Sequence, residues 1–293
     1  MECRHCHSSD PRLIEQFRIN KGGITRLYCK QCRRITTNFA APKILLFDIE
    51  VSRGIYKLYN PGKQTVGLKD VEARAFMLGW CAKWLFDDKV YSSFVTRQEA
   101  KNRDDYNVVK RLYPLISKAD LVIAHNGDKY DIRKINWFFS LYNFQPNNRY
   151  ITLDTYKKSK ELFGAESCSL GYLLKMYGFN GKGVMYSEDW EDIETGRVSA
   201  KVKAEPYCRD DVLGLEDLYL KIRPWIRHHP NMSIYYEMYH PLEEEESYCP
   251  RCLHVLGDMR WDKQYRTPNG TIYASANCPH CGSVLRKCKK YVK

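Results

Sequence analysis

The sequence predicts an α/β protein in which a mixed β-sheet flanked by helices lies between two small cysteine-rich modules. Three observations support this prediction. Apolar strand-like segments alternate with helical segments between residues 43 and 242. Cys-x-x-Cys pairs occur only near the two ends of the chain, and the net charge of +12 is also confined there. We therefore expect three domains, comprising residues 1–42, 43–242 and 243–293.

The elements of the middle domain follow from local patterns. Apolar or alternating runs predict strands at residues 44–51, 74–85, 89–95, 120–124 and 149–153. Helical spacing of apolar residues predicts helices at residues 104–116, 132–142, 169–177 and 207–226. We expect Pro206 to stand at the start of the last helix, where a missing N–H is tolerated.

Composition restricts the class of protein. A chain of 293 residues with 44% hydrophobic residues can bury one substantial core. No run of eighteen apolar residues occurs, and the N-terminus MECRHCHSSD lacks the apolar stretch of a signal peptide. We expect an intracellular protein without a membrane partner, located in the cytoplasm or associated with the nucleoid or nucleus.

The eight paired cysteines have the spacing of metal ligands. The two N-terminal pairs are separated by 22 residues and the two C-terminal pairs by 25. Each set fits a zinc ribbon holding one structural Zn²⁺ on four thiolates, and an iron–sulfur cluster on one module is the alternative. The expected ligands are Cys3, Cys6, Cys29 and Cys32 in the first module and Cys249, Cys252, Cys278 and Cys281 in the second.

The charge distribution suggests what these modules do. Residues 1–42 carry eight Lys/Arg against three Asp/Glu, residues 247–293 carry nine against two, and the middle of the chain is neutral. The runs RLYCKQCRR and LRKCKKYVK mix cations with tyrosine, which suits contacts to phosphates and stacking on bases. The modules are therefore expected to grip nucleic acid; a purely structural role is the alternative.

Two acidic side chains interrupt the first apolar strand. In ILLFDIEV, alternation places Asp48 and Glu50 on one face and Phe47 and Ile49 on the other. Two neighbouring carboxylates on a buried strand repel each other unless a cation neutralises them. An exposed edge strand fits poorly with the apolar residues ILLF. We therefore interpret this pair as metal ligands.

Two further segments carry candidate residues of this kind. HNGDKYD follows the apolar strand at 120–124, where ligand-binding residues collect in α/β sheets, and supplies Asn126 and Asp131. In the same segment, Asp128 is expected to be a loop or N-cap residue. In YCRDD, Tyr207 and Asp211 are four residues apart and share one helical face.

Together, FDIE, HNGDKYD and YCRDD resemble, in order and spacing, the motifs of the DEDD 3′–5′ exonucleases of the RNase H-like superfamily. The Tyr-x-x-x-Asp form of the last motif is similar to that of the proofreading domains of family B DNA polymerases. LDTYKKSKELF and SLGYLLKMYG also resemble the family's connecting segment. The resemblance covers about residues 43–225 and implies an RNase H-like mixed five-stranded sheet.

The resemblance also implies a mechanism with two Mg²⁺ or Mn²⁺ ions on four carboxylates. Asp48 would bridge the ions, Glu50 and Asp211 would complete one site, and Asp131 would support the other. Tyr207 would orient the attacking water, because a hydroxyl that ordinarily ionises near pH ~10 positions better than it deprotonates. Asn126 would contact the terminal nucleotide.

The sequence therefore predicts a freestanding 3′–5′ exonuclease that acts on DNA, with a replication or repair protein as a further expected partner. Two alternatives remain open at this level. The same site could serve an exoribonuclease, or the chain could be a non-catalytic zinc protein that binds nucleic acid. The complete set of four acids argues against the last reading.

Overall fold

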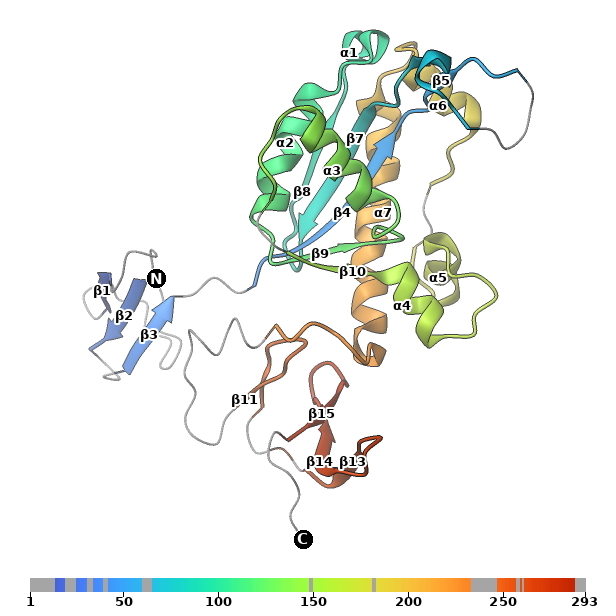
Figure 1. Ribbon diagram of the computed structural model, residues 1–293. Helices are drawn as coiled ribbons and strands as arrows, with labels where there is room; N and C mark the ends of the chain where they lie inside the picture. The colour runs from blue at the N-terminus through green and yellow to red at the C-terminus, as the bar shows by residue number, and fades with distance from the viewer. Residues whose placement is uncertain are drawn as a thin grey trace. The chain divides into compact units, whose positions relative to one another are not determined.

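A computed structural model describes residues 14–18, 25–30, 34–38, 42–59, 65–147, 150–180, 183–232, 247–256, 259 and 261–287, with the backbone alone for 14–18, 25–29, 34–38 and 247. The chain divides into two compact units. One unit comprises residues 43–222 and contains the large sheet (Figure 1). The other comprises residues 1–42 together with residues 223–293.

The large sheet is mixed and, among the described residues, has five strands in the order β10–β9–β4–β7–β8. The strands are β4 (Ile44–Val51), β7 (Met77–Trp84), β8 (Val90–Phe94), β9 (Leu121–Ala124) and β10 (Ile151–Asp154). The central strand β4 runs parallel to β9 and antiparallel to β7, while β9–β10 is parallel and β7–β8 antiparallel. The predicted mixed five-stranded sheet is confirmed.

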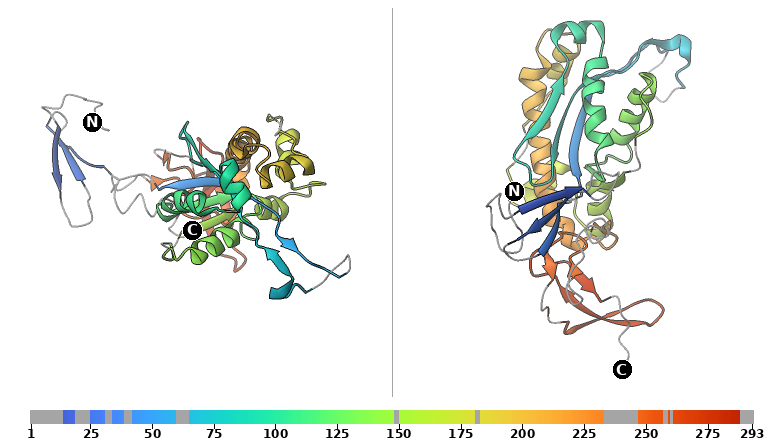
Figure 2. Two further views of the ribbon diagram at one scale, coloured as in Figure 1. Left: turned by 90° about the horizontal axis from the view of Figure 1, so that it is seen from above. Right: turned by 90° about the vertical axis from the view of Figure 1, so that its left-hand side faces the viewer.

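Helices cover both faces of this sheet, so the unit has three layers (Figure 2). The long helix α7 packs on β4 and β7 from one side, and α2 and α3 lie on the other. The helices are α1 (Arg97–Asn102), α2 (Tyr106–Ser117), α3 (Asp131–Leu141), α4 (Thr155–Leu162), α5 (Leu170–Met176), α6 (Ser187–Glu194) and α7 (Ala200–Ile222). In the described part of the chain, no helix combines the length and apolar character needed to cross a bilayer.

Alternation along β4 assigns its two faces to different layers. Leu45, Phe47 and Ile49 are buried in the core that also contains Leu112 of α2 and Phe138 of α3. Asp48 and Glu50 therefore face the α7 side. A short two-stranded ribbon, β5 (Ile55–Tyr56) with β6 (Val71–Ala73), follows β4 along the chain.

The last helix differs from its sequence prediction. It begins at Ala200, so Pro206 lies inside α7 rather than at its start. Proline removes one backbone hydrogen bond from a helix interior. Burial of Ala204 and Cys208 and the hydrogen bond from the Ser92 hydroxyl to Glu205 (2.6 Å) hold the turns on either side of it. Tertiary packing therefore overrides the local proline signal.

Three short helices, α1, α4 and α6, were not predicted, because six to eight residues carry too little periodicity to be recognised. Asp128, expected to be a loop or N-cap residue, lies in the turn before α3, and Tyr130 occupies the N-cap position. The Asp128 carboxylate instead lies 3.8 Å from the Lys157 ammonium group of α4, because the chain makes an additional turn before α3 begins.

The terminal residues form small sheets. The described strands are β1 (Ile14–Arg18), β2 (Thr25–Cys29) and β3 (Arg34–Asn38) in the N-terminal segment, and β11 (Ser247–Tyr248), β12 (Val255–Leu256), β13 (Lys263–Arg266), β14 (Ile272–Asn277) and β15 (Val284–Arg286) in the C-terminal segment. The three N-terminal strands form one antiparallel sheet. Strands β13, β14 and β15 form another, which packs Leu285 against Leu256 beside the cysteines.

Candidate active site

Strand β4 brings the first two acidic side chains to the centre of the sheet. Asp48 and Glu50 are partly buried, whereas the alternate residues Phe47 and Ile49 are buried on the opposite face. The pairing of β4 with β7 shifts register between Glu50 and Val51. β-Bulges of this kind bend strands and re-aim side chains, and this one directly follows Glu50.

The end of β9 places the third acid beside β4. The chain leaves the sheet through Asn126, which has a positive φ of 64°, and Gly127. A Cβ atom on Gly127 would lie 2.4 Å from the Ala124 Cβ atom, so the tight turn requires glycine. Asp131 then opens α3 with only 4% of its surface exposed, and its carboxylate accepts a hydrogen bond from the Ile49 backbone N–H.

Helix α7 supplies the fourth acid from the other side of β4. Asp211 is buried, with 6% exposure, whereas its neighbour Asp210 is exposed. The Cys208 thiol, on the same helix, lies 3.5 Å from Asp48 Oδ2. Tyr207 is half-buried and packs edge-on against Trp190 of α6, with ring centroids 5.9 Å apart.

The four carboxylates interact electrostatically. The pKa of Asp48 is raised well above its usual value, first by burial and then by the charges of Glu50, Asp131 and Asp211. Burial also raises the pKa of Asp131 to about 7. The candidate ligand atoms of Asp48, Glu50 and Cys208 lie within 4.8 Å of one another. Acids from three distant segments thus share one site, and their mutual repulsion favours bound cations.

Sequence reasoning did not identify two residues that contact or support this site. Cys208 was not among the predicted site residues, although its spacing of three residues from Asp211 places both on one side of a helix. Asp154, only 5% exposed, ends β10 and accepts hydrogen bonds from the backbone N–H groups of Asn126 (2.9 Å), Asp128 (3.3 Å) and Lys157 (3.2 Å). It therefore ties the turn after β9 to the first turn of α4.

His125 reinforces the same junction. Its Nδ1 atom lies 2.9 Å from the Thr155 hydroxyl of α4, and its Nε2 atom lies 3.0 Å from the Cys168 carbonyl oxygen. Both ring nitrogens are engaged by neighbouring segments, so this histidine has a structural role.

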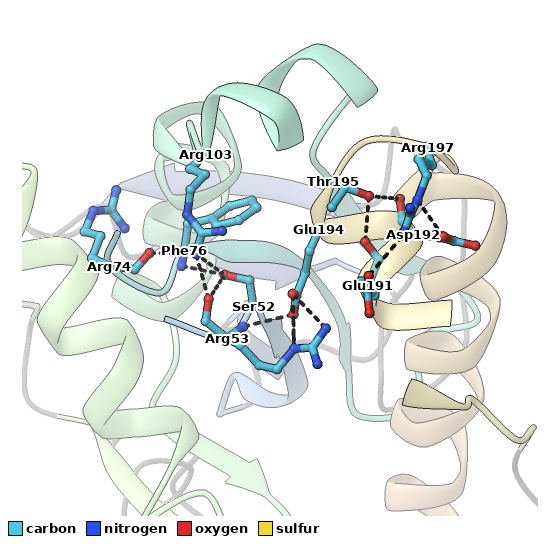
Figure 3. A network of polar contacts seen from close by, with 10 residues as sticks. All are labelled: Ser52, Arg53, Arg74, Phe76, Arg103, Glu191, Asp192, Glu194, Thr195 and Arg197. Atoms are coloured by element: carbon cyan, nitrogen blue, oxygen red, sulfur yellow. Dashed lines mark hydrogen bonds and ion pairs between the residues drawn. The ribbon is translucent and has the colours of Figure 1, made fainter. Parts of the chain in front are cut away.

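A polar network holds the exit of β4 (Figure 3). The Phe76 backbone N–H donates to the Ser52 hydroxyl (2.9 Å), and the Arg53 backbone N–H donates to Glu194 of α6 (2.9 Å). The Arg103 guanidinium donates to the carbonyl oxygens of Arg53 (2.6 Å) and Arg74 (2.9 Å). Helix α6 therefore links the end of the strand that carries Glu50 with the ring of Tyr207.

A second candidate metal centre lies in the C-terminal module. The sulfur atoms of Cys249, Cys252, Cys278 and Cys281 all lie within 4.8 Å of one another. Both Cys-x-x-Cys turns have the same form. Leu253 and Gly282, which follow the second cysteine of each pair, have φ values of 61° and 73°. Backbone N–H groups of these two residues donate to the carbonyl oxygens of Cys249 and Cys278. Four converging thiols in matched turns are compatible with tetrahedral zinc.

The N-terminal module also contains two Cys-x-x-Cys pairs. Cys3, Cys6 and Cys32 lie outside the described residues, and only the backbone of Cys29, the last residue of β2, is described. The predicted N-terminal zinc site therefore stays a prediction.

Comparison of the chain with known protein families identifies one match. A family model of the RNase H superfamily matches residues 58–223, which is more than half of the chain. The chain belongs to the RNase H superfamily. The match includes α3 and α7, which carry Asp131 and Asp211, and begins after β4, which carries Asp48 and Glu50.

Two further comparisons add little to this assignment. No curated protein sequence matches the chain. Among solved structures, the chain is similar to the family B DNA polymerase from the hyperthermophilic archaeon Pyrobaculum calidifontis, with 14% sequence identity and a TM-score of 0.46. The similarity covers 87% of this chain but 41% of the polymerase chain, so this chain spans less than half the polymerase's length.

Proposed function

We propose that the protein is a metal-dependent 3′–5′ exonuclease that hydrolyses phosphodiester bonds of DNA. One observation carries this proposal: the carboxylates of β4, α3 and α7 share a single site on an RNase H-like nuclease fold. The order of the acids and the Tyr-x-x-x-Asp spacing on α7 support the 3′–5′ polarity through the resemblance to DEDD exonucleases.

The donor set fits divalent cations. Buried carboxylates that raise one another's pKa values form a strongly acidic, oxygen-rich cluster, and hard cations such as Mg²⁺ and Mn²⁺ prefer oxygen ligands. The residues that would hold two such ions are Asp48, Glu50, Asp131 and Asp211. When bound, a pair of ions stabilises the attacking and leaving oxygens of an in-line phosphodiester displacement.

Other residues of the site would position the reactants. Tyr207, whose ring is oriented by the edge-on contact with Trp190, would hydrogen-bond the attacking water. Asn126, in the turn after β9, would contact the terminal nucleotide. Asp154 would act through that turn, because its carboxylate accepts the Asn126 N–H. We also propose zinc on the C-terminal cysteines and on Cys3, Cys6, Cys29 and Cys32.

A cleavage assay tests the proposal. Single-stranded DNA and RNA, labelled at the 3′ or the 5′ end, are incubated with the purified protein and Mg²⁺, Mn²⁺ or no added cation. We expect release of a labelled mononucleotide from 3′-labelled DNA and a ladder of progressively shorter products from 5′-labelled DNA. Faster cleavage of RNA would reassign the substrate and retain the site.

Three variants separate the roles of these residues. The double substitution Asp48→Ala/Glu50→Ala is expected to abolish cleavage, and Tyr207→Phe to slow it about 10- to 100-fold. Asp210→Asn is the matched control, because it removes a charge from the exposed side of α7 and should leave the rate unchanged. Internal cleavage, shortening from the 5′ end, or full activity in Asp48→Ala/Glu50→Ala would overturn the proposal.

A further inference from the structure

The sheet of β13, β14 and β15 has two faces of different character. The register pairs Tyr265 with Tyr273, Lys263 with Ser275, and Ser275 with Arg286, so all five side chains lie on one face. We call this the outer face. The alternate residues of β14 and β15, Ala274, Ala276 and Leu285, are buried on the opposite face, where Leu285 packs with the cysteines.

Aromatic and cationic groups on the outer face are already in contact with one another. The Arg286 guanidinium carbon lies 4.4 Å from the ring centroid of Tyr273 and 5.7 Å from that of Tyr265. Tyr265 nevertheless keeps 41% of its surface exposed. Lys263 is exposed at the edge of the face and donates a 2.6 Å hydrogen bond to Asn277. The face therefore presents a pre-positioned cation beside two rings without enclosing either.

The local charge indicates the sign of the partner. Residues 261–287 contain four Lys/Arg and a single acid, Asp262. Asp262 precedes β13, and none of the five side chains of the outer face is acidic. A positive surface with accessible aromatic rings and no carboxylate suits a polyanion that also has flat apolar groups.

We propose that the outer face, through Tyr265, Tyr273, Arg286 and Lys263, is a stacking platform for single-stranded nucleic acid. Bases stack on the tyrosine rings and on the guanidinium plane, and Lys263 and Arg286 contact phosphates. The bound form is single-stranded, because a duplex encloses the base faces that such a platform needs. This inference rests on the proposed nuclease function in its choice of polymer, and it names residues of the C-terminal module that would bind the strand.

Fluorescence anisotropy with labelled oligothymidylate, oligouridylate and a DNA duplex tests the platform. The full-length chain carries Asp48→Ala/Glu50→Ala throughout, so that substrate is not degraded and no chelator that would strip zinc is needed. We expect Tyr265→Ala/Tyr273→Ala to weaken single-strand binding about 5- to 100-fold and to change duplex binding little. Tyr265→Phe/Tyr273→Phe keeps the rings and should bind like the parent.

A charge-matched pair separates the platform from general electrostatic attraction. Arg286→Ala and Arg266→Ala each remove one exposed arginine from the same sheet, but Arg266 alternates with Tyr265 and lies on the opposite face. We expect Arg286→Ala to weaken single-strand binding about fivefold or more and Arg266→Ala less than about twofold. Zinc content and thermal unfolding of each variant verify that the module is folded.

Two results would overturn the inference. One is equal weakening by Arg286→Ala and Arg266→Ala, and the other is parental affinity in a folded Tyr265→Ala/Tyr273→Ala variant. Either result would leave the nuclease proposal standing. Conversely, an absence of cleavage by the wild-type chain with the platform effects intact would reject the nuclease proposal and keep the single-strand platform.

Discussion

Replacing Asp131 with asparagine should abolish nuclease activity and at the same time stabilise the cation-free fold. Burial raises the pKa of Asp131 from 3.8 to about 7, because the carboxylate has only 4% exposure. The charged form is therefore disfavoured in the folded protein. Asparagine has nearly the same shape, carries no charge, and can still accept the hydrogen bond from the Ile49 N–H.

The sign and size of the effect follow from proton linkage. A raised pKa means that the folded state binds the proton more tightly than the unfolded state does. Ionisation of Asp131 therefore reduces the free energy of unfolding. This reduction is absent below pH 3.8, grows between pH 3.8 and about 7, and is constant above that. Each pH unit in this window corresponds to about 1.4 kcal/mol, so ionising Asp131 costs about 4 kcal/mol at about pH 8. Because the buried amide has its own desolvation cost, we expect a net gain of about 2–4 kcal/mol.

Thermal unfolding in buffer freed of divalent cations on a chelating resin measures this gain. At about pH 8, Asp131→Asn should raise the unfolding temperature by about 5–10 °C, since 1 kcal/mol corresponds to about 2–4 °C in a domain of this size. The difference should shrink toward zero near pH 4. Added Mg²⁺ or Mn²⁺ should stabilise the wild type more than the variant.

Asp210→Asn provides the control, because removing a charge at an exposed position changes stability by less than about 0.5 kcal/mol. Two outcomes would contradict this prediction: a loss of stability in Asp131→Asn at every pH, and an equal gain in stability at about pH 4 and pH 8. Either outcome would mean that the Asp131 carboxylate is not held at an electrostatic cost in the folded protein.

Three further predictions concern two buried carboxylates, Asp154 and Asp105, and one cysteine of the C-terminal module, Cys278. Asp154→Ala should destabilise the fold by about 2–3 kcal/mol in urea unfolding, because three backbone N–H groups lose their acceptor. The same variant should reduce the cleavage rate at least about tenfold. Asp154→Asn should recover part of both losses. Asp105→Ala should cost about 3 kcal/mol in the same assay, since the fully buried carboxylate accepts hydrogen bonds from the Arg74 guanidinium (2.7 Å) and the Met77 N–H (2.7 Å); an unchanged urea midpoint would contradict this. Cys278→Ser should lower the zinc content by one ion per chain, measured by plasma mass spectrometry, and unchanged zinc would refute the C-terminal site.

The regular elements were predictable because their signals are local. The run ILLFDIEV predicts a buried strand with two acids on one face, and β4 is that strand. Helix α6 and the start of α7 were not predictable in this way. Glu194 of α6 is hydrogen-bonded to Arg53, 141 residues away, and α7 is buried against the sheet, so both depend on the rest of the fold. Helix α4 has a local N-cap, since Asp154 accepts the Lys157 N–H, but its eight residues are too few to show a helical period.

The sequence alone determined which residue types stand at which spacing. It identified the acids of FDIE, HNGDKYD and YCRDD and the four Cys-x-x-Cys pairs, since periodicity and motif spacing are properties of neighbouring residues. Only the tertiary structure decided that Cys208 contacts Asp48, 160 residues away, and that Tyr265 and Tyr273 share a face with Arg286. It also decided the pKa of Asp131, because desolvation and the approach of distant charges exist only after the chain has folded.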